Sequence, residues 1–139
     1  MIIDFHTHCF PEKIAARAME ILIKRSGIIH PSHDGTYQSL LCDAKKSGVD
    51  FSVVLNIATN PHQQKSVNDF AISLKSVEGI IPFGSVHPDS PDAIDELERL
   101  SLNGIKGVKL HPDYQGFFID EDKMLPIYEK IASLGMITV

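Results

Sequence analysis

The 139-residue sequence has no tryptophan, only two cysteines and no long apolar run. A membrane-spanning helix needs about 20 consecutive apolar residues, so the sequence predicts none. The amino-terminal stretch MIIDFHTH lacks the positive flank and apolar segment of a secretory signal peptide. Cys9 and Cys42 form no CxxC metal motif and no disulfide framework. We therefore expect a reduced, cytoplasmic protein in which both cysteines are small buried residues.

An excess of basic residues is also missing, because the formal net charge is −5. Domains that bind nucleic acid through bulk electrostatics usually carry a basic surface, so nucleic acid is not favoured as a partner. Hydrophobic residues make up 43% of the chain and charged residues 22%, a composition typical of a soluble globular protein. We expect one domain over residues 1–139.

Short β-rich runs alternate with segments of helical apolar spacing. The alternation predicts parallel strands joined by helical crossovers, as in a doubly wound open sheet or a (β/α)₈ barrel. A complete barrel has eight strands and about 250 residues, whereas this sequence supplies five strands. The expected strands are Ile2–Phe5, Phe51–Ile57, Ile80–Val86, Ile105–Leu110 and Met136–Val139. The expected helical stripes are Ile14–Leu22, Tyr37–Ala44, Val67–Val77, Ala93–Leu100 and Met124–Leu134.

The first strand runs directly into an HxH motif. Side chains alternate along a strand, so Asp4, His6 and His8 share one face. Imidazoles two residues apart sit about 6–7 Å from each other at Cα, and both can reach one metal ion. His6 and His8 are therefore candidate metal ligands. Asp4 is either a further ligand or, as we favour, a hydrogen-bond partner that orients a ligating imidazole.

Four of the seven histidines fall at carboxyl ends of the expected strands, where α/β folds build their sites. His87 follows the third strand and is a candidate contact to substrate. Lys109 and His111 share one face of the fourth strand and are candidate catalytic residues. A lysine inside a barrel is costly unless it is paired or modified. Lys109 could neutralise a substrate carboxylate, form a carboxylated metal bridge, or pair with Asp4.

Two further features lie outside this pattern. His30 and His33 occupy a turn-rich loop, which predicts exposure to solvent, although such a loop could also overhang a site. Asn56 and Asn60 end the second strand and are weaker candidates for substrate binding.

Three segments resemble a known family. IIDFHTHCFPEKIA closely resembles the opening of the amidohydrolase-related metal-dependent hydrolases, a family that includes decarboxylases similar to aminocarboxymuconate semialdehyde decarboxylase. GSVHP and GIKGVKLHPDYQGF are similar to family members in the same order and at similar spacing. The resemblance implies the N-terminal part, about five β/α units, of a (β/α)₈ TIM barrel. It also implies a divalent metal, by expectation zinc, with His6 and His8 as ligands.

The resemblance further implies an incomplete site. The family's other ligands are histidines after the fifth and sixth strands and an aspartate after the eighth, positions beyond Val139. A catalytic zinc site needs about three protein ligands and an open position. We therefore expect this chain alone to be inactive and to pair with another copy or with a C-terminal portion.

The implied chemistry is attack of a metal-activated water on an amide, lactone or ester carbon of a small molecule, amide-type or carboxylated. Lys109 and His111 would orient or neutralise an oxyanion or a carboxylate. Three alternatives stay open: a non-oxidative decarboxylase of the same family, a phosphoesterase or nuclease of the HxH barrel type, and a non-catalytic self-associating half-barrel.

Overall fold

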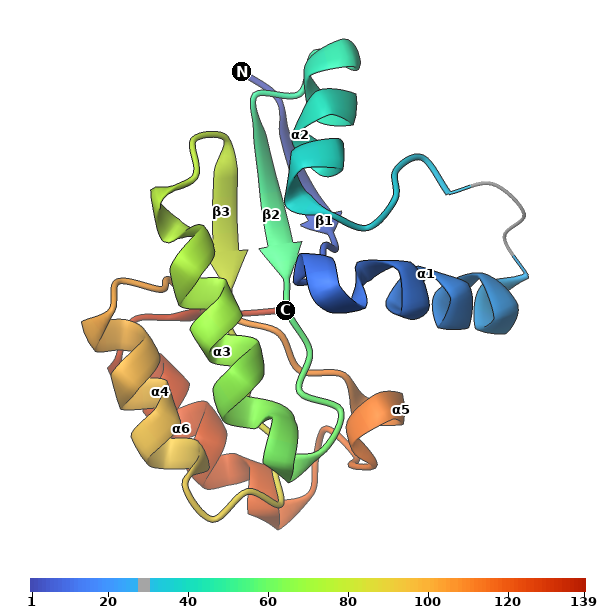
Figure 1. Cartoon of the computed structure of the whole chain (residues 1–139). Coiled ribbons are helices and arrows are strands. Elements are labelled where there is room, and N and C mark those ends of the chain that lie inside the picture. Colours follow the sequence, from blue (N-terminus) through green and yellow to red (C-terminus); the bar gives the residue numbers. More distant parts are fainter. Residues whose placement is uncertain (28–30) are drawn as a thin grey trace. The chain divides into compact units, whose positions relative to one another are not determined.

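The computed structural model describes residues 1–27 and 31–139 (Figure 1). These residues form two compact units, and each is described by itself. Unit 1 comprises residues 1–54 and 78–81, and unit 2 comprises residues 55–77 and 82–139. The strands are β1 (Ile3–Thr7), β2 (Phe51–Leu55), β3 (Ile80–Phe83), β4 (Gly107–Val108) and β5 (Ile137–Thr138). The α-helices are α1 (Glu12–Ser26), α2 (Tyr37–Lys46), α3 (Gln64–Ser73), α4 (Ala93–Leu102), α5 (Pro112–Gln115) and α6 (Leu125–Ser133). Three 3-10 turns are η1 (Pro61–Gln63), η2 (Leu74–Ser76) and η3 (Asp122–Met124).

The strands pair in parallel, as the alternation of elements predicts. One sheet has the order β1-β2-β3, with β1 parallel to β2, and the other joins β4 to β5 in parallel. A parallel bridge between Gly84 and Val108 connects the end of β3 to β4. The sequence placed all five strands, although β4 and β5 are shorter than expected because only two residues of each complete a ladder.

Strand β1 is an exposed edge of its sheet. It pairs with β2 from Ile3 opposite Phe51, and the register becomes irregular between Asp4 and Thr7. The Thr7 hydroxyl then donates to the Val53 carbonyl at 2.8 Å, which anchors the end of the strand. Four of the five β1 residues are exposed, and only Thr7 is buried. Unit 1 therefore presents a strand edge to which a further strand can bind.

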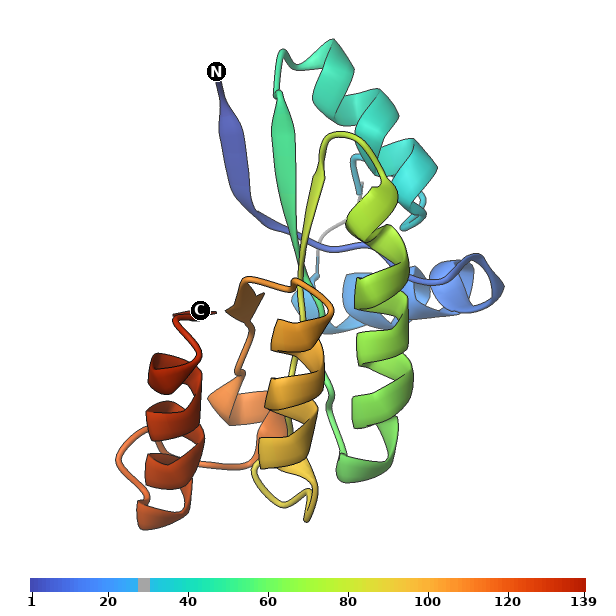
Figure 2. The same cartoon turned by 90° about the vertical axis from the view of Figure 1, so that its left-hand side faces the viewer.

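Unit 2 is built around one hydrophobic core. Helices α3, α4 and α6 lie side by side with α4 in the middle, and α4 contacts each of the other two (Figure 2). Leu97 and Leu100 on α4 are fully buried. Val86, Val108 and Leu110 from the β3 and β4 ends belong to the same core. Val108 and Leu110 therefore pack toward the helices, which leaves the opposite face of these strands for polar residues.

The close packing of β3 against β4 depends on one glycine. A Cβ placed at Gly107 would lie 2.1 Å from the ring of Phe83, a distance that no side chain tolerates. Phe83 is buried and fills the space that a side chain at residue 107 would need. Gly107 therefore permits the close strand contact that places Lys109 and His111 beside the end of β3.

Buried charge joins α3 to α4. The Glu96 carboxylate is buried, accepts from Asn68 Nδ2 at 2.8 Å and also binds the Arg99 guanidinium. Arg99 reaches Asp69 at 2.8 Å as well. Hydrogen bonding to Glu96 raises the pKa of Arg99 above its usual value, so the guanidinium stays charged. The pair compensates the cost of burying the Glu96 carboxylate.

The two cysteines differ from each other. Cys9 is buried, as expected, but Cys42 is exposed on α2, so the expectation of two buried cysteines is wrong for Cys42. Its position on the solvent side of an amphipathic helix explains the difference. Within the described residues, no helix is long and apolar enough to cross a membrane.

Replacing Leu97 by alanine should test the core of unit 2. Leu97 has no exposed surface, so Leu97→Ala should lower the free energy of unfolding by about 2–5 kcal/mol. Leu102 is 87% exposed on the same helix, and Leu102→Ala should change it by no more than about 0.5 kcal/mol. Urea unfolding followed by circular dichroism measures both, and equal losses would contradict the assigned core.

Candidate active site at the strand ends

His6 and His8 lie together at the end of β1 in unit 1. Their ring centroids are 5.1 Å apart with an interplanar angle of 66°, so the two side chains share one side of the strand. The carboxylate of Asp4 accepts the His6 backbone N–H at 3.1 Å. Asp4 therefore holds the main chain of the HxH motif.

The separation of these two rings fits a shared metal ion. A zinc-bound imidazole nitrogen lies about 2.0–2.1 Å from the ion, which puts the ring centroid about 3.2 Å away. Two rings at a tetrahedral angle then have centroids about 5 Å apart. The pair matches this value, but among residues 1–27 and 31–139 no group of three or more His, Cys, Asp or Glu is placed to hold a metal. Unit 1 thus offers two ligands of a site that needs about three.

Cys9 directly follows the motif but is not suited to metal binding or nucleophilic attack. Its side chain is buried, and this burial raises the pKa of the thiol to about 12. A thiolate is the form that binds metals and attacks electrophiles. Cys9 is therefore a neutral, buried residue that directly follows the HxH segment in the sequence.

In unit 2 the ends of β3 and β4 run in register. The bridge pairs Gly84 with Val108, and His87 and His111 each follow a paired residue by three positions. The Ser85 hydroxyl donates to the Lys109 carbonyl at 2.8 Å, which carries the pairing beyond the short ladder. Two of the candidate residues thus belong to one strand end and the third to its neighbour.

Gln115 connects the strand-end loops of unit 2. Its side chain is buried and donates through Nε2 to the Ala58 carbonyl at 3.0 Å and the Val86 carbonyl at 2.8 Å. Its Oε1 accepts the His111 backbone N–H at 2.7 Å. A single amide group therefore joins the segments that follow β2, β3 and β4.

Other buried polar side chains complete this connection. Asn68 on α3 accepts from the Ser85 backbone N–H and donates to the Ser85 carbonyl, both at 2.8 Å. Asn56 donates to the Phe83 carbonyl at 2.8 Å, and the Ser85 hydroxyl accepts from Ala58 N–H at 3.1 Å. Asn60 caps η1 by accepting from the Gln63 backbone N–H. In these contacts, Asn56 and Asn60 hold the loop that follows β2.

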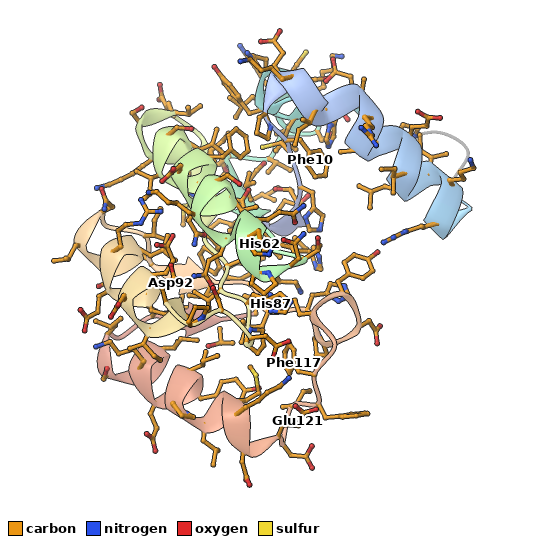
Figure 3. The ribbon with its side chains drawn as sticks, turned by 60° about the horizontal axis from the view of Figure 1, so that its bottom comes forward. Phe10, His62, His87, Asp92, Phe117 and Glu121 are labelled. Atoms are coloured by element: carbon orange, nitrogen blue, oxygen red, sulfur yellow. The ribbon has the colours of Figure 1, made fainter. Side chains whose placement is uncertain are left out.

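His87 is a buried histidine with a fixed backbone. Its N–H donates to Gln64 Oε1 at 2.9 Å, and Gln64 in turn donates to Asp92 at 3.0 Å. Figure 3 labels His87 and Asp92 on the connection from β3 to α4. His87 Nδ1 accepts from the Asp89 backbone N–H at 3.2 Å. Burial lowers the pKa of His87, which favours the neutral imidazole.

His111 and Lys109 are half-buried at the end of β4. The His111 ring stacks on Tyr114 with centroids 4.1 Å apart, and its Nδ1 accepts the Tyr114 backbone N–H at 3.4 Å. Within the described part of unit 2, Lys109 makes no ion pair. Asp4 belongs to unit 1, so its pairing with Lys109 stays a prediction.

The turn-rich loop contributes one described histidine. His33 is half-buried and its Nδ1 accepts from the Gly35 backbone N–H at 3.0 Å, so it shapes the turn before α2. The expectation that His33 is exposed to solvent is therefore only partly met. His30 lies outside the described residues.

Sequence reasoning missed the residues that position the site. Gln64, Asn68, Ser85 and Gln115 are all buried polar side chains bonded to strand-end backbone. Their types carry no metal or acid–base chemistry, so a search for reactive residues passes over them. The available signal was helical spacing. Gln64, Asn68 and Ala71 follow one another at intervals of four and three residues, so they share one face of α3, and all three are buried.

Replacing Gln115 by leucine should destabilise the fold strongly. The change leaves two buried carbonyls and the His111 N–H without their partner, so the free energy of unfolding should fall by roughly 3 kcal/mol or more. Gln63 is exposed, and Gln63→Leu is the matched control, with an expected change within about 0.5 kcal/mol. Thermal and urea unfolding measure both variants, and a neutral Gln115→Leu would contradict the bridging role.

The chain is similar to solved structures, and one of them matches it across nearly all its length. That structure is a probable 2-pyrone-4,6-dicarboxylic acid hydrolase from Acinetobacter baumannii, solved with citric acid bound. The match has a TM-score of 0.56 and 16% sequence identity, and it covers 99% of this chain. It covers 48% of the other chain, so this chain spans about half the length of that hydrolase. No curated protein sequence matches the chain.

The likeness confirms the fold class. An α/β chain with parallel strands that covers about half of this hydrolase is consistent with part of a (β/α)₈ barrel. The amidohydrolase family model matches residues 3–138, almost the whole sequence. This chain belongs to the amidohydrolase family.

Proposed function

We propose that this chain carries part of the site of a metal-dependent hydrolase that acts on an amide, lactone or ester carbon of a small molecule. The observation that carries the proposal is the His6–His8 pair, whose ring separation of 5.1 Å suits a shared ion. Membership of the amidohydrolase family supports the same chemistry. The catalyst is completed by residues that this chain does not supply.

His6 and His8 would hold the metal, which we propose to be zinc. A bound divalent ion supplies a water of lowered pKa and polarises a carbonyl. Asp4 positions the motif by accepting the His6 backbone N–H. The buried, neutral Cys9 thiol stays out of the ligand set.

Lys109 and His111 would act on the substrate. They alternate along the chain with Val108 and Leu110, which belong to the core, so they are expected to share the opposite face of the β4 end. Lys109 has no ion-pair partner in the described residues of unit 2, so its charge is available to an anionic group. His111 is fixed by Gln115 and by stacking on Tyr114, so it can orient a substrate oxygen.

A carboxylated substrate is favoured over a plain amide. The similar solved structure is named for a dicarboxylic acid and was solved with citric acid, both of which carry carboxylates. An unpaired lysine at a strand end suits the same group.

A decarboxylase of this family would use the same groups, and release of CO₂ from a carboxylated substrate would identify it. Phosphate release from an aryl phosphate would instead favour a phosphoesterase.

The exposed edge of unit 1 supports pairing with another polypeptide. Ile3 and Phe5 on β1 are 43% and 47% exposed, and Ile14 and Ile21 on α1 are also exposed. A strand at the edge of a sheet with exposed apolar side chains is a template for another strand. The partner is a second copy of this chain or a C-terminal portion of the same barrel.

Metal affinity should depend on the HxH pair. Removing either ligand with His6→Gln or His8→Gln should weaken zinc binding at least about 10–100-fold, because loss even of a group that supports a ligand costs that much. His62 is exposed on η1, and His62→Gln is the matched control with unchanged affinity. Isothermal titration of the metal-stripped chain measures all three. Equal affinities in the HxH variants and the control would overturn the assignment.

Self-association should depend on β1. At high concentration the chain should show twice its mass of 15.4 kDa, and Phe5→Lys should return it to a single copy because a charge on the edge strand opposes pairing. Leu102→Lys, at an exposed site in unit 2, should leave the mass unchanged. Light scattering after size exclusion measures this. A chain of 15.4 kDa at every concentration would contradict pairing with a second copy.

A further inference from the structure

Two strand ends of unit 2 carry the same three residues, His-Pro-Asp, at residues 87–89 and 111–113. The bridge between Gly84 and Val108 puts both histidines three residues beyond paired positions. Neighbouring parallel strands lie about 4.8 Å apart, so the two backbones are adjacent at this bridge. Beyond the bridge Gln115 holds the two segments together, because its side chain bonds both the Val86 carbonyl and the His111 N–H.

Both imidazoles are held in the same way. Nδ1 of His87 accepts the Asp89 backbone N–H at 3.2 Å, and Nδ1 of His111 accepts the Tyr114 backbone N–H at 3.4 Å. A nitrogen that accepts an N–H has no proton of its own, so in the neutral ring the proton is on Nε2. Each ring thus presents an Nε2–H donor that makes no hydrogen bond within the described residues.

Resting on the proposed function, we infer that His87 and His111 form a paired donor site that binds a substrate carboxylate. Two neighbouring N–H donors match the two oxygens of a carboxylate, each of which accepts at about 2.7–3.2 Å. Lys109, on the same strand face as His111, supplies positive charge beside the pair. Gln115 is the positioning residue, since it joins the two strand ends through one amide group.

The hydrogen bonds of His87 and His111 do not suit metal binding. A histidine that binds metal through Nε2 donates its Nδ1–H to a carbonyl or carboxylate. Here a backbone N–H bonds each Nδ1 atom, which puts the proton of the neutral ring on Nε2. The Asp89 carboxylate lies farther from His87 Nδ1, at 4.0 Å, than the Asp89 N–H does, at 3.2 Å. His87 is also 5% exposed, and its burial disfavours the imidazolium form. The two histidines are therefore neutral donors, distinct in chemistry from the HxH pair.

Imidazole nitrogen NMR of the full chain tests this directly. Long-range ¹H–¹⁵N spectra of the metal-stripped, ¹⁵N-labelled chain report the tautomer of each histidine. We expect the Nε2–H form for His87 and His111, and saturable shifts of both when sodium malonate is added. Malonamide, which has the same shape without charge, should give no saturable shift.

Two substitutions sharpen the test. His111→Gln should weaken malonate binding at His87 about tenfold, whereas His62→Gln should leave it unchanged. The Nδ1–H tautomer at either histidine, equal shifts with malonamide, or no shift with malonate would overturn the inference. Zinc binding at the HxH pair is measured separately, so loss of malonate binding with zinc binding intact overturns only the donor pair. Malonate binding without zinc binding would overturn only the metal proposal.

Discussion

The arrangement of unit 2 depends on the need to pair backbone groups where short parallel strands end. Strand β4 has two residues, and after it the Lys109 and Leu110 N–H groups still bond backbone carbonyls, whereas the His111 N–H bonds a side chain. The Gln115 amide takes over this task for segments that come from three strands. An unpaired buried carbonyl or amide costs about 1–3 kcal/mol, so these bonds determine whether the strand ends hold one shape. These hydrogen bonds also fix the backbone of the candidate residues Lys109 and His111.

The histidines at the strand ends differ in whether a backbone N–H donates to Nδ1 of the ring. In the HxH segment the strand alternation alone brings two rings to one side, and their spacing suits an ion. In the His-Pro-Asp segments the chain turns back so that a backbone N–H occupies Nδ1, and the ring becomes a donor. On the two proposals made above, the same side chain would bind a cation at one strand end and an anion at two others.

The sequence predicted the elements well because their signals are local. Helical spacing located α1, α2, α3, α4 and α6, and β-rich runs located all five strands. The face of β4 was also predictable, because alternation put Val108 and Leu110 in the core and left Lys109 and His111 opposite. The exposure of Cys42 was missed because its position on α2 relative to the core depends on packing.

The polar connections were not predictable from the sequence. Gln115 and Ser85 contact residues 24 to 57 positions away, and their partners are mostly backbone atoms that leave no trace in residue type. The tautomers of His87 and His111 likewise follow from turns whose geometry the sequence does not reveal. Metal-binding residues were easier to propose because the HxH spacing is itself the signal.

The central claim is that this chain divides its strand-end histidines between a metal and an anion. X-ray absorption spectroscopy of the zinc-loaded chain tests it most directly, because the scattering pattern counts imidazole ligands. The account predicts two imidazoles per zinc ion, from His6 and His8. A count of three or four that falls to two in a His87→Gln, His111→Gln variant would contradict it, because those histidines would then be serving as metal ligands.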